Sequence, residues 1–85
     1  MDEAFDQAQA RVRALKKTPS NTDLLELYAL YKQGSLGNCE GKRPSMLDPR
    51  GRAKFDAWSK KRGMTKEQAR AKYVALVEQL ETKYA

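Results

Sequence analysis

The spacing of apolar residues predicts helices along most of the chain. In the first segment apolar residues recur at three- and four-residue steps, the period of one helix face: Phe5, Ala8, Val12 and Leu15. We expect this helix to run for about four turns and to end at residues 16–19. There, two lysines suit the negative end of the helix dipole, and Pro19 disfavours helical geometry at the residue before it.

A second helix should begin after Ser20 and end near Ser35. Residues 20–23 carry side chains that cap helix N-termini, with Asp23 placed as in an acidic form of the capping box. The periodicity is then lost over residues 36–50, which contain two glycines and two prolines. This stretch predicts a long ordered loop, and its adjacent Met46 and Leu47 favour a loop packed against the domain.

Two further helices follow the loop. The third is predicted from about Gly51 to just before Gly63, with Asp48 capping the turn into it and an apolar face that carries Phe55 and Trp58. The fourth and longest begins at a Thr-Lys-Glu-Gln capping box and carries one apolar stripe: Ala69, Tyr73, Leu76, Val77, Leu80 and Tyr84. This pattern predicts an all-α fold, a four-helix bundle that forms a single domain over residues 1–85, with Tyr73 in its core.

The charge balance favours an anionic partner. Seventeen Lys and Arg against eleven Asp and Glu give a formal charge of +6, which suits nucleic acid, an anionic membrane surface or a phosphorylated metabolite. Charge alone does not choose among the three. The chain has no histidine and a single cysteine, so we expect no metal site, no catalytic residues and no disulfide within the chain. We also expect a cytoplasmic protein without signal peptide or membrane anchor.

Two tyrosines and two lysines indicate a more specific ligand. At about 100° per residue on a helix, Tyr28, Tyr31 and Lys32 fall within roughly a quarter turn, and Lys54 lies near the start of the third helix. Tyrosine rings stack on heterocycles and lysines bind phosphate as mobile charges, so the combination indicates a nucleotide-like ligand. The alternative is that the tyrosines are packing residues and the lysines are solvated.

These residues belong to a longer ordered pattern. Its segments are residues 27–33 (LYALYKQ), Gly37-Asn38, Arg43-Pro44, residues 46–48 (MLD), residues 51–58 (GRAKFDAW) and Gly63-Met64, extended by Phe5, Leu15, Pro19, Ala69, Tyr73 and Val77. In this pattern the chain resembles the acyl-CoA-binding protein family over nearly its whole length. The resemblance implies a four-helix fold with a skewed arrangement around a ligand groove.

The resemblance also implies a function and a site. The function is the non-enzymatic intracellular binding, buffering and transport of long-chain fatty acyl-CoA esters, without a cofactor. The matching tyrosines and lysines surround the adenine and the 3′-phosphate: Tyr28, Tyr31, Lys32, Lys54 and Tyr73. The remaining implied ligand-binding residues lie along the ligand path or within the same helical segment: Arg13, Leu24, Leu25, Ala29, Leu30 and Arg50. We expect a monomer that makes transient contact with anionic membranes or acyl-CoA-using enzymes and does not bind nucleic acid.

One alternative function stays open at this point. A basic helical module that binds nucleic acid or an anionic membrane surface would use the same cations without a deep pocket. It predicts a dispersed set of contacts that includes Lys16, Lys17, Lys60, Lys61 and Arg62.

Overall fold

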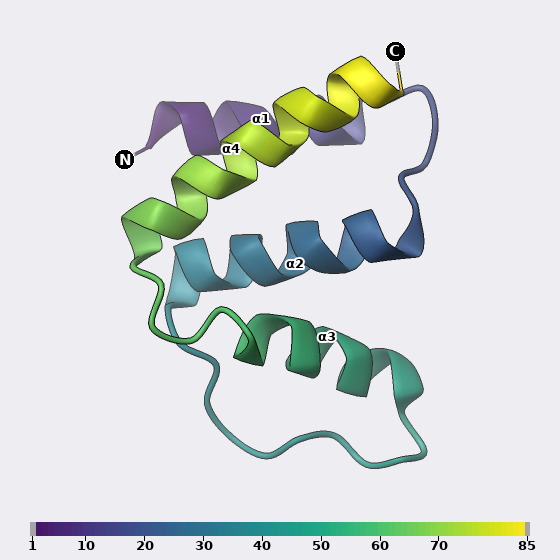
Figure 1. The fold of residues 1–85 in the computed structure, drawn as a ribbon, viewed down its shortest axis with the longest axis vertical. Helices are drawn as coiled ribbons and strands as arrows, with labels where there is room; N and C mark the ends of the chain where they lie inside the picture. Colours follow the sequence, from purple (N-terminus) through teal and green to yellow (C-terminus); the bar gives the residue numbers. More distant parts are fainter. Residues whose placement is uncertain (1, 85) are drawn as a thin grey trace.

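Four helices make up the computed structural model, which describes residues 2–84. Their bounds are α1 Glu3–Arg13, α2 Asn21–Leu36, α3 Pro49–Ser59 and α4 Lys66–Lys83. Helix α4 packs against both α1 and α2, while α3 packs against the other side of α2 (Figure 1). The helices therefore form a skewed, flat arrangement that measures 36 × 27 × 15 Å. The predicted all-α, four-helix fold with a long loop before the third helix is confirmed.

Helix α1 is one turn shorter than the apolar spacing predicted. Asp2 caps its N-terminus by accepting a hydrogen bond from the Phe5 N–H, and the helix ends at Arg13. Beyond it the chain tightens, because the Leu15 N–H donates to the Val12 carbonyl three residues back. Leu15 still packs against the core from this tighter turn, so its apolar spacing extended the predicted helix too far.

The start of α2 is tied to the end of α4 rather than closed by a complete capping box. The Ser20 hydroxyl accepts from the Asp23 N–H as predicted. The Ser20 N–H, however, donates to the Tyr84 hydroxyl at 3.2 Å, and that hydroxyl donates to the Asp23 carboxylate at 3.2 Å. The acidic capping box is therefore wrong in its second half. The box predicted at the start of α4, between Thr65 and Gln68, is complete.

Helix α3 lies earlier in the sequence than predicted. Asp48 caps it by accepting from the Gly51 N–H, and Pro49 occupies the first helical turn, where its missing N–H is not needed. The helix ends at Ser59, and the turn at residues 60–63 leads to Gly63 with φ +94°. Gly63 thus closes this turn. It does not directly follow the helix, contrary to our prediction.

The long loop, residues 37–48, is pinned to the domain over its first half. Trp58 Nε1 donates to the Gly37 carbonyl at 2.8 Å, and Arg62 donates to the Cys39 carbonyl at 2.7 Å. Arg43 forms a two-bond ion pair with Asp56 on α3, at 2.9 and 2.7 Å. These bonds hold an ordered path along α3, and they bury Cys39.

The prediction that Met46 and Leu47 pack against the domain is wrong. Met46 is 83% exposed and Leu47 is 95% exposed. Helix α3 packs against α2 on its inner side, and the loop passes along its outer side, far from α1 and α4 (Figure 1). The rest of the apolar core therefore lies beyond the reach of these two side chains.

The core joins α1, α2 and α4 and leaves α3 at its edge. Its buried members are Phe5, Ala8, Leu27, Leu30, Tyr73, Val77 and Leu80. The tight approach of α4 depends on Gly34, because a Cβ there would lie 2.9 Å from the Cγ of Arg70. No residue of α3 is fully buried. Helix α3 consequently forms one wall of a groove against α2.

Candidate functional site

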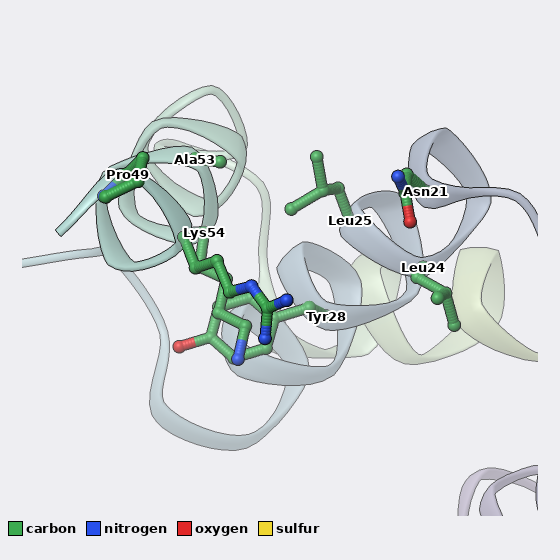
Figure 2. Close-up of a pocket in the computed structure, with 8 residues that line it drawn as sticks. Asn21, Leu24, Leu25, Tyr28, Pro49, Ala53 and Lys54 are labelled. Carbon is green, nitrogen blue, oxygen red and sulfur yellow. The ribbon is translucent and has the colours of Figure 1, made fainter.

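Two adjoining cavities lie along α2, and they share Leu24 and Tyr28. We call the first the leucine cavity; it has a volume of about 570 Å³ between α2 and α3 (Figure 2). Its lining residues are Asn21, Leu24, Leu25, Tyr28, Pro49, Arg50, Ala53 and Lys54. We call the second the tyrosine cavity; it has a volume of about 370 Å³. Its lining residues are Gln9, Val12, Arg13, Leu24, Leu27, Tyr28, Tyr31 and Tyr73. Leu24 and Tyr28 form the ridge between the two cavities.

The Tyr28 ring holds two ammonium groups beside it. Lys32 lies one turn further along α2, and its Nζ is 5.7 Å from the ring centroid. Lys54 reaches the same ring from α3, with its Nζ at 5.3 Å, and Figure 2 shows its side chain running alongside Tyr28. Neither ammonium lies within ion-pairing distance of a carboxylate in the part of the chain that the structure describes. Two unneutralised cations around one phenol make a site for an anion.

Aromatic rings line the neighbouring tyrosine cavity. The Tyr31 ring stacks near Phe5 with centroids 6.0 Å apart, and the Tyr73 ring meets Phe5 edge-on at 5.2 Å. Tyr31 is 36% exposed, whereas Tyr73 is 4% exposed. Burial raises the pKa of the Tyr73 phenol against the opposing charge of Arg13, so it remains a neutral hydrogen-bond donor at physiological pH. This cavity offers ring surface, a phenol and a guanidinium to a polar aromatic ligand.

The structure brings together most of the residues proposed from the resemblance. Those that line one or both cavities are Arg13, Leu24, Leu25, Tyr28, Tyr31, Arg50, Lys54 and Tyr73. Lys32 stands beside Tyr28, between its ring and that of Trp58. Ala29 and Leu30 differ, because they are 0% and 2% exposed and their side chains line neither cavity. Helix α2 turns these two residues toward its buried side.

Sequence reasoning missed several lining residues whose spacing pointed to them. Ala53 lies three residues after the predicted Arg50 on α3, so these two residues share a helix face. Gln9 likewise lies four residues before the predicted Arg13 on α1, and both line the tyrosine cavity. Neighbours at helical spacing around each predicted cation were therefore the available signal.

The described residues offer no other obvious chemical centre. Within residues 2–84 no cluster of three or more His, Cys, Asp or Glu side chains is placed to hold a metal ion. Across the same range, no helix has the length and apolar character that crossing a membrane requires. The two cavities along α2 are the candidate site because they gather most of the predicted residues.

Comparison with known proteins identifies the family. Residues 2–77, which include every proposed site residue, match the family described as Acyl CoA binding protein. The chain belongs to the acyl-CoA-binding protein family. An acyl-CoA-binding protein homolog of Manduca sexta is 56% identical over 94% of this chain and 90% of its own length. Homolog 1 of Caenorhabditis elegans is 51% identical over 95% of this chain and 94% of its own.

Solved structures from the acyl-CoA-binding protein family share the fold. The crystal structure of acyl-CoA-binding protein 2 from Oryza sativa superposes with a TM-score of 0.90 at 38% identity, covering 95% of this chain and 90% of that one. The Moniliophthora perniciosa crystal structure gives a TM-score of 0.89 at 34% identity, over 99% and 84% of the two chains. The flat, skewed helix arrangement is therefore the arrangement of this family.

Proposed function

We propose that this protein binds long-chain fatty acyl-CoA esters and buffers and transports them without chemical change. The observation that carries the proposal is the pair of unneutralised ammonium groups around Tyr28, at the ridge between an apolar cavity and an aromatic one. An acyl-CoA ester has the same order of parts. Its phosphates are anionic, its adenine is a flat ring and its tail is apolar.

Each part of the ligand has a matching surface. The fatty tail occupies the leucine cavity, where Leu24, Leu25 and Ala53 provide apolar walls. The adenine lies against Tyr31 and the phenol edge of Tyr73 in the tyrosine cavity. The 3′-phosphate sits between Lys32 and Lys54, within reach of the Tyr28 hydroxyl.

The two halves of the ligand contribute differently to binding. Apolar burial is worth about 0.8 kcal/mol per methylene, so the tail supplies affinity in proportion to the length that is covered. Charge-assisted hydrogen bonds to phosphate contribute about 1.5–3 kcal/mol each and discriminate the ester from a free fatty acid. We therefore expect tight binding only when both halves are present.

The tertiary contacts weigh against a dispersed basic surface for nucleic acid. Lys61 pairs with Glu26 at 2.6 Å and its side chain is only 19% exposed. Arg62 donates to the Cys39 carbonyl at 2.7 Å. Two of the five cations that the alternative requires are thus engaged within the protein itself.

We further propose that the protein acts as a monomer in the cytosol. Its single cysteine is buried and unpaired, which fits a reducing compartment. Each copy carries a charge of +6, which disfavours self-association. Membership of a family of binding proteins supports a carrier rather than an enzyme.

Calorimetric titration with palmitoyl-CoA, free coenzyme A and palmitate tests the proposal. We expect palmitoyl-CoA to bind far more tightly than either fragment, because only the ester fills both cavities. Equal affinity for palmitate and palmitoyl-CoA would show that the cations around Tyr28 do not recognise a nucleotide.

A further inference from the structure

The tip of the long loop exposes two apolar side chains to water. Met46 and Leu47 are adjacent and are 83% and 95% exposed. They occupy the two central positions of a turn in which the Asp48 N–H donates to the Ser45 carbonyl at 3.0 Å. The Leu47 N–H also donates to the Ser45 hydroxyl at 3.2 Å. The turn therefore fixes both residues outward. We call Met46 and Leu47 the loop tip.

The chain around the loop tip is strongly basic. Five cations lie within residues 42–54: Lys42, Arg43, Arg50, Arg52 and Lys54. The same range contains one acid, Asp48, whose carboxylate caps α3 by accepting from the Gly51 N–H. Arg43 is neutralised by its ion pair with Asp56. Arg52 shares a cavity with Met46, whereas Arg50 and Lys54 line the cavity between α3 and α2. The loop that carries the apolar pair lies on the side of α3 that faces away from α1 and α4 (Figure 1).

We propose that the loop tip docks this protein on anionic membrane surfaces. Met46 and Leu47 enter the boundary between headgroups and acyl chains, while Lys42 and Arg52 contact lipid phosphates and carboxylates. Buried apolar area and attraction to anionic lipid are the two contributions that hold a peripheral protein at a bilayer. The loop tip supplies the apolar area, and Lys42 and Arg52 supply the positive charge.

The position of the loop tip relates docking to the site, and this relation rests on the proposed function. Met46 lines a shallow cavity of about 360 Å³ together with Pro49 and Ala53. Pro49 and Ala53 also line the leucine cavity. A membrane at the loop tip is thus next to the opening through which a fatty tail enters or leaves the protein.

A membrane fits this surface better than a protein does. A second copy of the chain would bring the same basic segments together, and each copy already carries a charge of +6. Two side chains on a turn also offer much less than the roughly 800 Å² that each partner contributes to a standard protein interface. A bilayer needs no matching pocket and provides the opposite charge.

Vesicle sedimentation tests the docking directly. The protein is mixed with vesicles of phosphatidylcholine alone, or of equal parts phosphatidylcholine and phosphatidylserine. We expect binding only to the anionic vesicles. The double substitution Met46→Ser with Leu47→Ser should weaken that binding by about tenfold or more. The matched control is Leu36→Ser. It removes a leucine that is 63% exposed at the C-terminal end of α2, and it should leave vesicle binding unchanged.

Two double variants that remove positive charge isolate the contribution of Lys42 and Arg52. Lys42→Gln with Arg52→Gln should weaken binding to anionic vesicles by roughly 30-fold, since each cation near such a surface contributes about fivefold. Lys16→Gln with Lys17→Gln removes the same charge elsewhere and should have a much smaller effect. An equal loss in both pairs would overturn the proposal in favour of diffuse attraction.

Insertion of the loop tip into the bilayer is measured by the fluorescence of a tryptophan placed there. The emission of Leu47→Trp should shift to the blue on anionic vesicles, whereas that of Leu36→Trp should not. No blue shift at position 47 on vesicles that bind the protein would overturn insertion. Sedimentation velocity tests whether a second copy of the chain occupies the loop tip instead. If the wild-type protein formed a dimer that Met46→Ser with Leu47→Ser lost, and vesicle binding were unchanged, the loop tip would be a self-association surface and the docking proposal would be overturned.

Calorimetry without vesicles separates this proposal from the proposed function. Both side chains of the loop tip lie almost entirely in water, so the double substitution should leave the melting temperature and the affinity for palmitoyl-CoA in solution unchanged. Failure of the wild-type protein to bind palmitoyl-CoA would refute the proposed function alone. Vesicle binding that survives the loss of the loop tip would refute the docking proposal alone.

Discussion

Replacing Lys32 by alanine tests the phosphate site most directly. The Lys32 Nζ lies 5.7 Å from the Tyr28 ring and 5.8 Å from the Trp58 ring, so two aromatic faces hold it beside the ridge between the cavities. If it donates to the 3′-phosphate, Lys32→Ala should weaken palmitoyl-CoA binding by about 1.5–3 kcal/mol. That loss is roughly a 10- to 150-fold rise in Kd.

The control ligand is palmitoyl-CoA without its 3′-phosphate. For the wild-type protein this ligand should bind at least as weakly as the complete ligand binds to Lys32→Ala, because Lys54 loses its partner too. Against the ligand without the 3′-phosphate, Lys32→Ala should cost no more than about 0.5 kcal/mol. The coupling energy from this double-mutant cycle, measured by calorimetry, isolates the contact between the ammonium and the phosphate. Additive penalties would refute the contact.

Two further measurements guard against an indirect effect. Lys72→Ala removes an exposed lysine that lines neither cavity, and it should leave the Kd unchanged. The unliganded Lys32→Ala protein should lose only about 0.5–1 kcal/mol of stability, the scale of a partly solvated cation–π contact. A much larger loss of stability would mean that the variant weakens binding by disturbing α2, and the phosphate assignment would then rest on the ligand series alone.

Three other outcomes follow from the structure. Palmitoyl-CoA at about a hundredfold above its Kd should stabilise the fold by roughly 2.7 kcal/mol, which calorimetry would register as a rise of about 10–20 °C in Tm. Hydrogen bonds from Arg43 lower the pKa of the Asp56 carboxyl, so this pair stabilises the fold above the ordinary carboxyl pKa. The contribution is lost as pH falls through the lowered pKa. Asp56→Asn should therefore flatten the acid side of a plot of Tm against pH, and an unchanged slope would contradict this. Gln33 is 0% exposed and donates to Asn38 Oδ1 and to the Met64 carbonyl; Gln33→Ala should cost about 2–4 kcal/mol in urea unfolding, and a cost below about 1 kcal/mol would show that water replaces these bonds.

Local patterns determined where the helices lie. The Asp48 cap, the Thr65 and Gln68 capping box and the apolar stripe of α4 all involve residues within a few positions of one another. Helical period and end chemistry act at that range, so the sequence alone predicted four helices and a buried Tyr73. The ordered pattern of residues likewise pointed to the family without any knowledge of contacts.

Local patterns misled wherever a distant partner decided the outcome. Asp23 has the right spacing for a capping box, but the Tyr84 hydroxyl takes the Ser20 N–H instead. Met46 and Leu47 are apolar, but the pinned loop carries them along the outer side of α3, where no core is available.

The binding site belongs to both levels. The spacing of Tyr28, Tyr31 and Lys32 within one helix already placed a phenol and an ammonium on a shared face. Tertiary structure alone brought Lys54 from α3 to within 5.3 Å of the Tyr28 ring. It also turned Ala29 and Leu30 into the interior. The distance between two helices depends on how the loop and the core fix them together, and no periodicity within either helix contains that information.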